Sequence, residues 1–265
     1  MKAVNLAFEN YGEPSSCPLL ILHGFLASSR NWRTIAGKLA SQHHVYVLDM
    51  RNHGTSPHAE KMDYPSMATD IMAFMDNQGI QRAHLLGHSM GGKVAMWFAL
   101  HFPERVERLL VADIAPMNYC HSFDAMIHAL RQLPLHRLAH RKHAEQLLAE
   151  AIPDLGFRQF LLQNLLLKDG QYYWRINLDI IQQNAHYIVG FPELMSKPYC
   201  RPVLFIAGER SNYIQAEKVL EVFPGAEFAE ISGVGHWLYV EAPDAFCRLV
   251  LDWLAPADLA ALQWM

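Results

Sequence analysis

The sequence has few cysteines, and they are widely spaced. None of the four stands in a C-x-x-C arrangement, which argues against a disulfide framework or a zinc site. Isolated cysteines suit free thiols in a reducing compartment. The amino terminus also lacks the apolar stretch of a secretory signal, so we expect a cytoplasmic protein.

A long apolar run and a strong charge are missing too. No run approaches the roughly 18 apolar residues of a membrane-spanning helix, so no membrane span is expected. The formal net charge is −4 and the basic residues are scattered, which predicts no nucleic-acid partner. A small-molecule substrate remains the natural expectation. No pattern specifies an oligomeric state.

The composition instead favours one large globular core. Hydrophobic residues make up 51% of the 265 residues and charged residues 18%, which is enough to bury a sizeable interior. This length is long for one plain domain and short for two, so we expect a single core that carries an insertion.

Short apolar runs alternate with Ala- and Leu-rich stretches of helical character. The runs are apolar on both faces, as strands are when helices cover both sides of a parallel sheet. The predicted fold class is therefore α/β, with a mostly parallel central sheet flanked by helices. The clearest strands cover residues 19–22, 45–48, 84–86, 109–112 and 203–207, and residues 226–231 are a further candidate.

This alternation stops between residues 116 and 198, where the sequence becomes rich in Leu, His, Gln and Arg. We interpret 116–198 as an inserted helical cap and assign 1–115 and 199–265 to the core domain. Residues 196–202 contain two prolines and are predicted to form the linker back into the core. Residues 255–265 are expected to form a short surface helix.

A G-x-S-x-G motif follows the predicted strand 84–86. Its serine is Ser89, flanked by Gly87 and Gly91, and a helix-like stretch follows from Lys93. Strand, tight turn and helix is the context in which such a serine is exposed as a nucleophile. Glycine is needed beside the serine because the turn leaves no room for side chains. Ser89 is therefore the candidate nucleophile.

A serine hydroxyl needs a base to remove its proton, and chain order selects one of the fifteen histidines. In folds with this motif the order is serine, acid, histidine. His236 lies between Gly235 and Trp237, just after the strand candidate 226–231. It is the candidate general base.

The loop after strand 19–22 is the expected place for part of an oxyanion hole. The backbone N–H groups of Phe25 and Met90 are the candidate donors, since pre-placed donors act on the charge that develops during acyl transfer. His23 and His88, beside these positions, are interpreted as structural hydrogen-bonding residues.

The acid is a choice between two positions. In folds with this motif, the acid usually stands three residues after the glycine that ends the next-to-last strand. Here that glycine is Gly208 and the position is occupied by Ser211, whose hydroxyl cannot stabilise an imidazolium. Asp113 ends a core strand and keeps the chain order, so it is the first candidate. Glu209 is the alternative. With Asp113 as the acid, Ser211 would add a supporting hydrogen bond.

Two other clusters suggest sites but have simpler explanations. His136, His140 and His143 fall on one face of a possible helix over residues 131–142 and beyond, yet basic residues interleave and no carboxylate accompanies them. A solvated basic helix is the preferred interpretation, so no metal is expected. Asp49 precedes the serine and is expected in a structured loop near the site.

Together these motifs resemble the α/β-hydrolase superfamily and, more narrowly, the YbfF-type bacterial esterases. The resemblance spans nearly the whole chain and implies an acid after strand six, which favours Asp113. It also implies hydrolysis of short acyl esters and of acyl-CoA thioesters, with no cofactor. The motifs that carry it are residues 23–24, 49–54, 87–92, 113–116 and 233–237.

The expected activity is that of a serine esterase or thioesterase working through a Ser-His-Asp acyl-enzyme mechanism. If acyl-CoA is a substrate, the basic residues at 131, 137, 141 and 142 could meet its phosphates. C–C bond hydrolysis or perhydrolysis by the same residues stays open, and so does a non-catalytic ligand-binding receptor. Dehalogenases and epoxide hydrolases are disfavoured, because they place an aspartate where this chain has Ser89.

Overall fold

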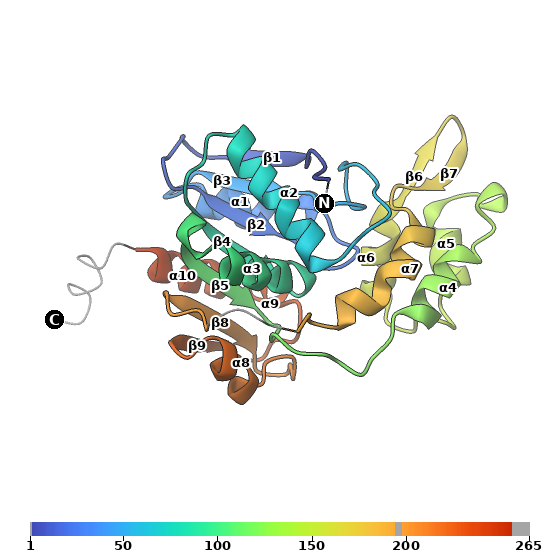
Figure 1. Ribbon diagram of the computed structural model, residues 1–265. Coiled ribbons are helices and arrows are strands. Elements are labelled where there is room, and N and C mark those ends of the chain that lie inside the picture. Colours follow the sequence, from blue (N-terminus) through green and yellow to red (C-terminus); the bar gives the residue numbers. More distant parts are fainter. Residues whose placement is uncertain (1, 194–197, 256–265) are drawn as a thin grey trace.

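The computed structural model describes residues 2–193 and 198–255. Within them, one seven-stranded sheet has the order β1-β3-β2-β4-β5-β8-β9 (Figure 1). Neighbouring strands run parallel except at one edge, where β1 is antiparallel to β3. The strands are β1 (Phe8–Tyr11), β2 (Leu19–Leu22), β3 (Val45–Leu48), β4 (Ala83–His88), β5 (Val106–Ala112), β8 (Val203–Gly208) and β9 (Ala226–Ile231).

The predicted mostly parallel α/β sheet is confirmed. The predicted bounds of β2, β3 and β9 match the structure, while β4, β5 and β8 each extend beyond the predicted runs. Strand β1 was not predicted, because its residues alternate between exposed and half-buried and form no apolar run. At the opposite edge, β9 exposes the side chains of Glu227 and Glu230.

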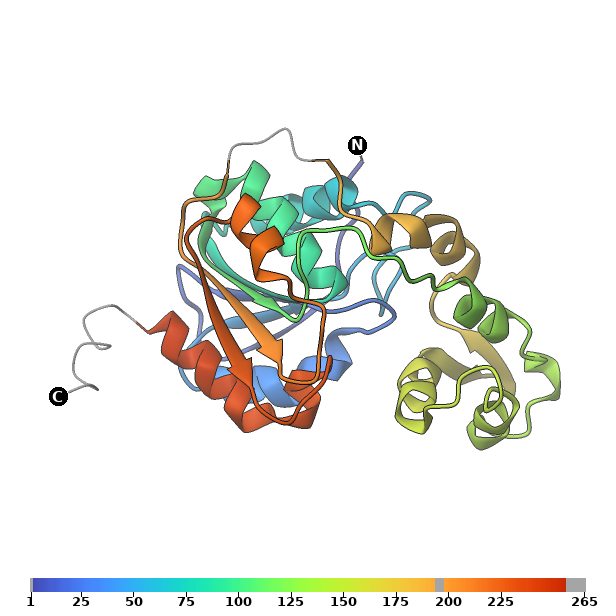
Figure 2. The ribbon, with the colours of Figure 1, turned by 90° about the horizontal axis from the view of Figure 1, so that it is seen from below.

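Helices cover both faces of the sheet, as Figure 2 shows. Alternate strand residues point to opposite faces, so Leu20 and Leu22 join one buried cluster while Leu19 and Ile21 join the other. The first cluster includes α2 (Tyr64–Asn77), α3 (Met90–His101) and α8 (Ala216–Val222), and the second includes η1 (Ser29–Trp32), α1 (Arg33–Leu39), α9 (Leu238–Glu241) and α10 (Pro243–Leu254). A short turn, η2 (Pro103–Arg105), precedes β5.

The chain between β5 and β8 folds beside the sheet (Figures 1 and 2). It contains an antiparallel strand pair, β6 with β7, which was not predicted. We call residues 116–198 the insertion. Its elements are α4 (Asp124–Arg131), η3 (Leu135–Arg137), α5 (Arg141–Leu147), α6 (Leu155–Leu161), η4 (Leu162–Asn164), β6 (Leu165–Lys168), β7 (Gln171–Trp174) and α7 (Leu178–Val189).

The expected helix over residues 131–142 is wrong. Helix α4 ends at Arg131 and α5 begins at Arg141. Pro134 lies between them, and proline in a helix interior removes a hydrogen bond and clashes with the preceding turn. His136, His140 and His143 therefore do not share one helix face.

Two predicted segments fall partly outside the described residues. The linker over 196–202 is described from residue 198 onward, and the surface helix over 255–265 lies outside beyond Ala255. Among the helices of residues 2–193 and 198–255, none is both long and apolar enough to cross a membrane.

Candidate active site

Ser89 occupies a strained turn between β4 and α3. Its backbone has φ 52° and ψ −119°, a conformation that a non-glycine residue adopts only when its surroundings enforce it. A Cβ on Gly87 would lie 2.3 Å from the carbonyl oxygen of Gly91, and one on Gly91 would lie 2.1 Å from that of Leu22. Only glycine fits at both positions, so the motif holds Ser89 on the tip of the turn.

Asp113 directly follows β5 and is fully buried. One carboxylate oxygen, Oδ2, accepts hydrogen bonds from Nδ1 of His236 at 2.7 Å and from the hydroxyl of Ser211 at 2.5 Å. The other, Oδ1, accepts from the amide of Gly208 at 3.2 Å. These donors satisfy both oxygens of the buried carboxylate without exposing it to water.

His236 lies in the loop after β9, which packs against the end of β8. A Cβ on Gly208 would lie 2.4 Å from the carbonyl oxygen of Gly235, so glycine permits this close approach. His88 donates from Nε2 to the backbone carbonyl of His236 at 2.8 Å. Burial lowers the pKa of His88 well below its usual value, which keeps that ring neutral. The ring of Tyr213 lies 4.3 Å from that of His236, centroid to centroid.

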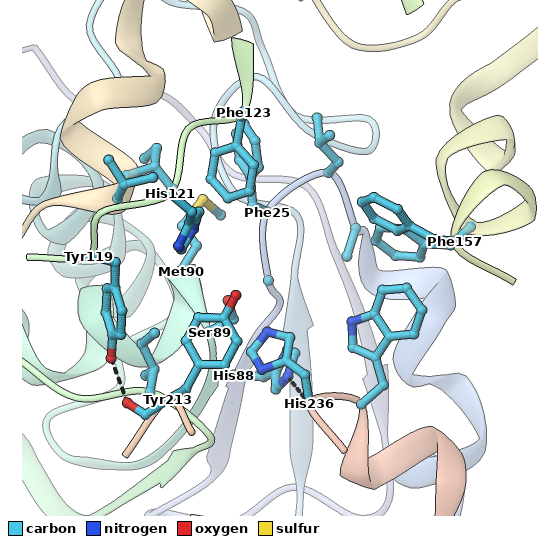
Figure 3. A pocket seen from close by; sticks show the side chains of 18 of the residues that line it. Phe25, His88, Ser89, Met90, Tyr119, His121, Phe123, Phe157, Tyr213 and His236 are labelled. Carbon is cyan, nitrogen blue, oxygen red and sulfur yellow. Dashed lines mark hydrogen bonds between the residues drawn. The ribbon is translucent and has the colours of Figure 1, made fainter. Parts of the chain in front are cut away.

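The structure thus brings Ser89, Asp113 and His236 to the same part of the molecule. His236 contacts Asp113 directly, and His236 and Ser89 line the same pocket (Figure 3). Ser211 reaches the same carboxylate. Glu209 does not share this arrangement: its carboxylate accepts from the amide of Gly233 at 2.5 Å and so braces the loop.

The pocket has a volume of about 590 Å³. Phe157 and Phe160 of the insertion face Trp237, the residue after His236, with ring centroids 5.6 and 5.1 Å away. The described residues that line the pocket include no arginine, and the charged ones are Lys93, Asp154 and Glu241. The cavity therefore suits an uncharged, largely apolar ligand.

The two candidate oxyanion donors also line this pocket. Met90 is the first residue of α3, and the first amides of a helix have no acceptor within the helix. Gly24, just before Phe25, lies against the nucleophile: a Cβ placed there would be 3.4 Å from the Cβ of Ser89. Phe25 is thus beside the point where an oxyanion would form.

The side chain of His53, in the loop after β3, holds the segment around Phe25. Nε2 of His53 accepts from the amide of Leu26 at 3.1 Å, and its Nδ1 donates to the carbonyl of Arg51 at 2.9 Å. Burial lowers the pKa of His53 to about 3, so the ring is a neutral acceptor. Nε2 of His23 similarly accepts from the amide of Met50 at 3.0 Å.

Asp49 lies in the same loop region and is buried. Its two carboxylate oxygens accept from the amides of Ser29 and Thr55, each at 2.7 Å. It therefore fixes loops near the site and does not face His236.

Lys93 is a buried residue that sequence reasoning did not single out. Its ammonium donates to the carbonyls of Val189 at 2.9 Å and Gly190 at 2.7 Å, at the end of α7. It also lies 4.6 Å from the ring centroid of Tyr119. Burial lowers the pKa of Lys93 to about 7. A signal was available, because this lysine is embedded in an otherwise apolar helix.

Asn164 is a second buried polar residue near the site that the sequence analysis did not identify. It is 1% exposed and reaches from the insertion to the carbonyl of Leu26, at 2.8 Å. A polar residue inside the run Phe-Leu-Leu-Gln-Asn-Leu-Leu-Leu was the available sequence signal.

The histidines of the insertion do not converge. His136 lies in η3, while His140 precedes α5 and accepts at Nδ1 from the amide of His143 at 3.0 Å. Throughout residues 2–193 and 198–255, no group of three or more His, Cys, Asp or Glu side chains is arranged to hold a metal.

Comparison with known proteins places these features in a family. Residues 18–243 match the family model described as alpha/beta hydrolase fold. The chain is 36% identical to the sn-1-specific diacylglycerol lipase ABHD11 of Xenopus laevis, over 97% of this chain and 86% of that protein. It is 33% identical to esterase YbfF of Escherichia coli, over 91% of this chain and 94% of that one.

A solved esterase structure has the same fold. A marine microorganism esterase superposes with a TM-score of 0.91 at 40% identity, covering 95% of this chain and all of that one. These matches confirm the resemblance drawn from the motifs: the chain belongs to the α/β-hydrolase fold family.

Proposed function

We propose that the protein is a serine carboxylesterase that hydrolyses uncharged esters of short acyl chains. The observation that carries this proposal is the hydrogen bond from His236 to the buried Asp113, because His236 lines the same pocket as Ser89. The names of similar proteins, which are esterases and a diacylglycerol lipase, support the same chemistry.

In the first half-reaction, Nε2 of His236 takes the proton of Ser89 as the hydroxyl oxygen attacks the ester carbonyl. Asp113 accepts from Nδ1 throughout and stabilises the imidazolium. His236 then returns the proton to the leaving alcohol oxygen. The carbonyl carbon stays bound to Ser89 as an acyl-enzyme.

In the second half-reaction, water attacks the acyl-enzyme and His236 takes its proton. Collapse of this second tetrahedral intermediate releases the acid and restores the hydroxyl of Ser89. The amides of Phe25 and Met90 are the proposed donors to both oxyanions, and one such donor is typically worth about 100- to 1000-fold in rate. None of these steps requires a metal or an organic cofactor.

We assign residues 116–198 the role of a cap that selects the substrate. Phe123, Phe157 and Phe160 of the insertion line the same pocket as Ser89. Large aromatic side chains favour apolar acyl or alcohol groups there.

Acyl-CoA thioesters are a narrower possibility within the same chemistry. Two of the four basic residues expected to meet the phosphates have other partners: Arg131 pairs with Asp179 at 2.7 Å, and Arg141 donates to the carbonyl of Leu165 at 2.7 Å. A CoA thioester would have to find its phosphate partners outside the pocket.

The proposed compartment is the cytoplasm. The four cysteines, Cys17, Cys120, Cys200 and Cys247, are all free, as expected in a reducing environment. Fractionation of the source cells, followed by detection of the protein, would test this assignment.

Labelling with a fluorophosphonate tests the nucleophile. We expect wild-type protein and Ser122→Ala, a change at an exposed serine of the insertion, to be labelled, and Ser89→Ala to be inert. A panel of p-nitrophenyl esters and acyl-CoAs would then define the substrate range. Retention of more than about one hundredth of turnover by Ser89→Ala would contradict the assignment, since losing a nucleophile costs far more.

A further inference from the structure

Leu26 has an unusual backbone conformation beside the candidate oxyanion hole. Its φ is 60°, in the left-handed region that a bulky side chain rarely adopts. Such a residue persists only when its surroundings hold it, at a cost of about 1–3 kcal/mol.

Two side chains from different parts of the chain hold Leu26. His53, from the loop after β3, accepts from its amide at 3.1 Å. Asn164, at the end of η4 in the insertion, donates from Nδ2 to its carbonyl at 2.8 Å. Leu26 is therefore fixed on one side by the core and on the other by the insertion.

Asn164 is itself firmly oriented. Its Oδ1 accepts from the guanidinium of Arg175 at 3.1 Å, and its own carbonyl accepts from the amide of Arg175 at 2.9 Å. The same guanidinium donates to the hydroxyl of Ser28 at 3.3 Å. Because Oδ1 faces a donor, Nδ2 must be the atom that faces Leu26.

We propose that Asn164 is a positioning residue for the oxyanion hole: by holding Leu26 in its left-handed conformation, it aims the amide of Phe25 at the developing oxyanion. This inference rests on the proposed esterase function. In addition to lining the pocket, the insertion would then help to form the oxyanion hole. The hole is complete only when Asn164 donates its hydrogen bond to the carbonyl of Leu26.

The predicted kinetic effect is specific. A donor aimed at the oxyanion acts in the transition state and not on the bound ester. Loss of the Asn164 contact should therefore lower kcat and leave KM nearly unchanged. A residue that only fastens the insertion would alter substrate binding or stability instead.

Asn164→Asp is the sharpest variant, because it keeps the shape and the acceptor for Arg175 but removes the donor to Leu26. Asn184→Asp is its matched control. Asn184 is another buried asparagine of the insertion, and it donates to the carbonyl of Glu60 at 2.9 Å and accepts from the amide of Met62 at 3.0 Å. It joins the insertion to the core away from Leu26.

On p-nitrophenyl butyrate, we expect Asn164→Asp to lower kcat by about 10- to 100-fold. This is less than the rate loss expected when one oxyanion donor is removed completely. We expect KM to stay within about twofold of the wild-type value. Asn184→Asp should lower kcat by less than about threefold. A trifluoromethyl ketone, which adds to Ser89 and places an oxyanion in the hole, should bind Asn164→Asp more weakly by a similar factor. Its affinity for Asn184→Asp should be unchanged.

Equal losses of kcat in the two variants, or an unchanged ketone affinity in Asn164→Asp, would overturn the inference. If Asn164→Asp does not fold, Arg175→Met provides the test, since it frees the Asn164 side chain without touching Leu26. Unchanged kcat and ketone affinity in that variant would equally refute the role. Failure of fluorophosphonate to label wild-type Ser89 would instead refute the proposed function itself.

Discussion

His236 donates to Asp113 across 2.7 Å, although the two residues are 123 positions apart and follow different strands. Asp113 comes after β5, whereas His236 comes after β9. Parallel strands place their carboxyl ends at one edge of a sheet, so groups from distant parts of the chain meet there. This pair is the most direct structural support for the assigned acid.

Asp113→Asn should reduce kcat by up to about 10⁴-fold, because an amide at this position favours the wrong tautomer of His236. Glu209→Gln, the control at the alternative acid, should change kcat little. The measurement is kcat on a short p-nitrophenyl ester, with circular dichroism to verify folding. A near wild-type rate for folded Asp113→Asn beside a crippled Glu209→Gln would move the acid to the later position.

Ser211→Ala should reduce kcat only a few-fold to tenfold. Its hydroxyl donates to the carboxylate of Asp113 but takes no part in the proposed proton transfer between Ser89 and His236. One such hydrogen bond is worth about 0.5–1.5 kcal/mol. Steady-state kinetics beside the exposed Ser122→Ala variant would measure the effect. A loss as large as that of Asp113→Asn would show that Ser211 takes part directly.

Lys93→Met should destabilise the fold by about 1–3 kcal/mol, since it leaves the part-buried carbonyls at the end of α7 without their donor. Lys218→Met is the control: Lys218 is exposed and pairs with Glu221 at 2.8 Å, and its loss should cost less than about 0.5 kcal/mol. Urea unfolding at pH 7 compares the two. Equal midpoints for both variants would show that the Lys93 contacts contribute nothing.

Stability should fall as the pH drops below about 6.5. Burial lowers the pKa values of His23, His53 and His88, with that of His53 at about 3. The unfolded chain therefore takes up protons at these sites before the folded chain does. The stabilisation is full above the unfolded pKa near 6.5 and is lost on acidification, at about 1 kcal/mol per histidine and pH unit.

The His53→Asn variant isolates one of these contributions. Its urea midpoint should depend less steeply on pH between 6.5 and 5 than that of the wild type. His58→Gln, at an exposed histidine, should retain the wild-type slope. An identical slope in His53→Asn and wild type would contradict a neutral, buried His53.

Local signals in the sequence were sufficient where the structure is decided locally. Apolar runs located most strands of the parallel sheet, and the glycines around Ser89 identified the turn because no other residue fits there. Strand β1 was not predicted, because its residues alternate between exposed and half-buried positions and form no apolar run. Pro134 was the overlooked signal that separates α4 from α5.

Contacts between distant segments could not be predicted in this way. Asn164 meets Leu26 across 138 positions, and Lys93 meets Val189 across 96. Each residue alone is only a polar side chain in an apolar stretch, and its partner is a backbone carbonyl that carries no sequence signature. Chain order and strand ends favoured Asp113 over Glu209, and Asp113 is the residue that contacts His236 in the structure; its role as the acid stays a prediction.

The edge strand β9 bears on how copies of this protein meet one another. An edge strand offers unpaired backbone groups to any other strand, and this is a common route to aggregation. Here Glu227 and Glu230 project into solvent along that edge, and like charges would face each other if two such edges paired. We therefore expect these carboxylates to oppose pairing between two such edges, and neutralising both of them should make concentrated solutions precipitate more readily, even with the pocket intact.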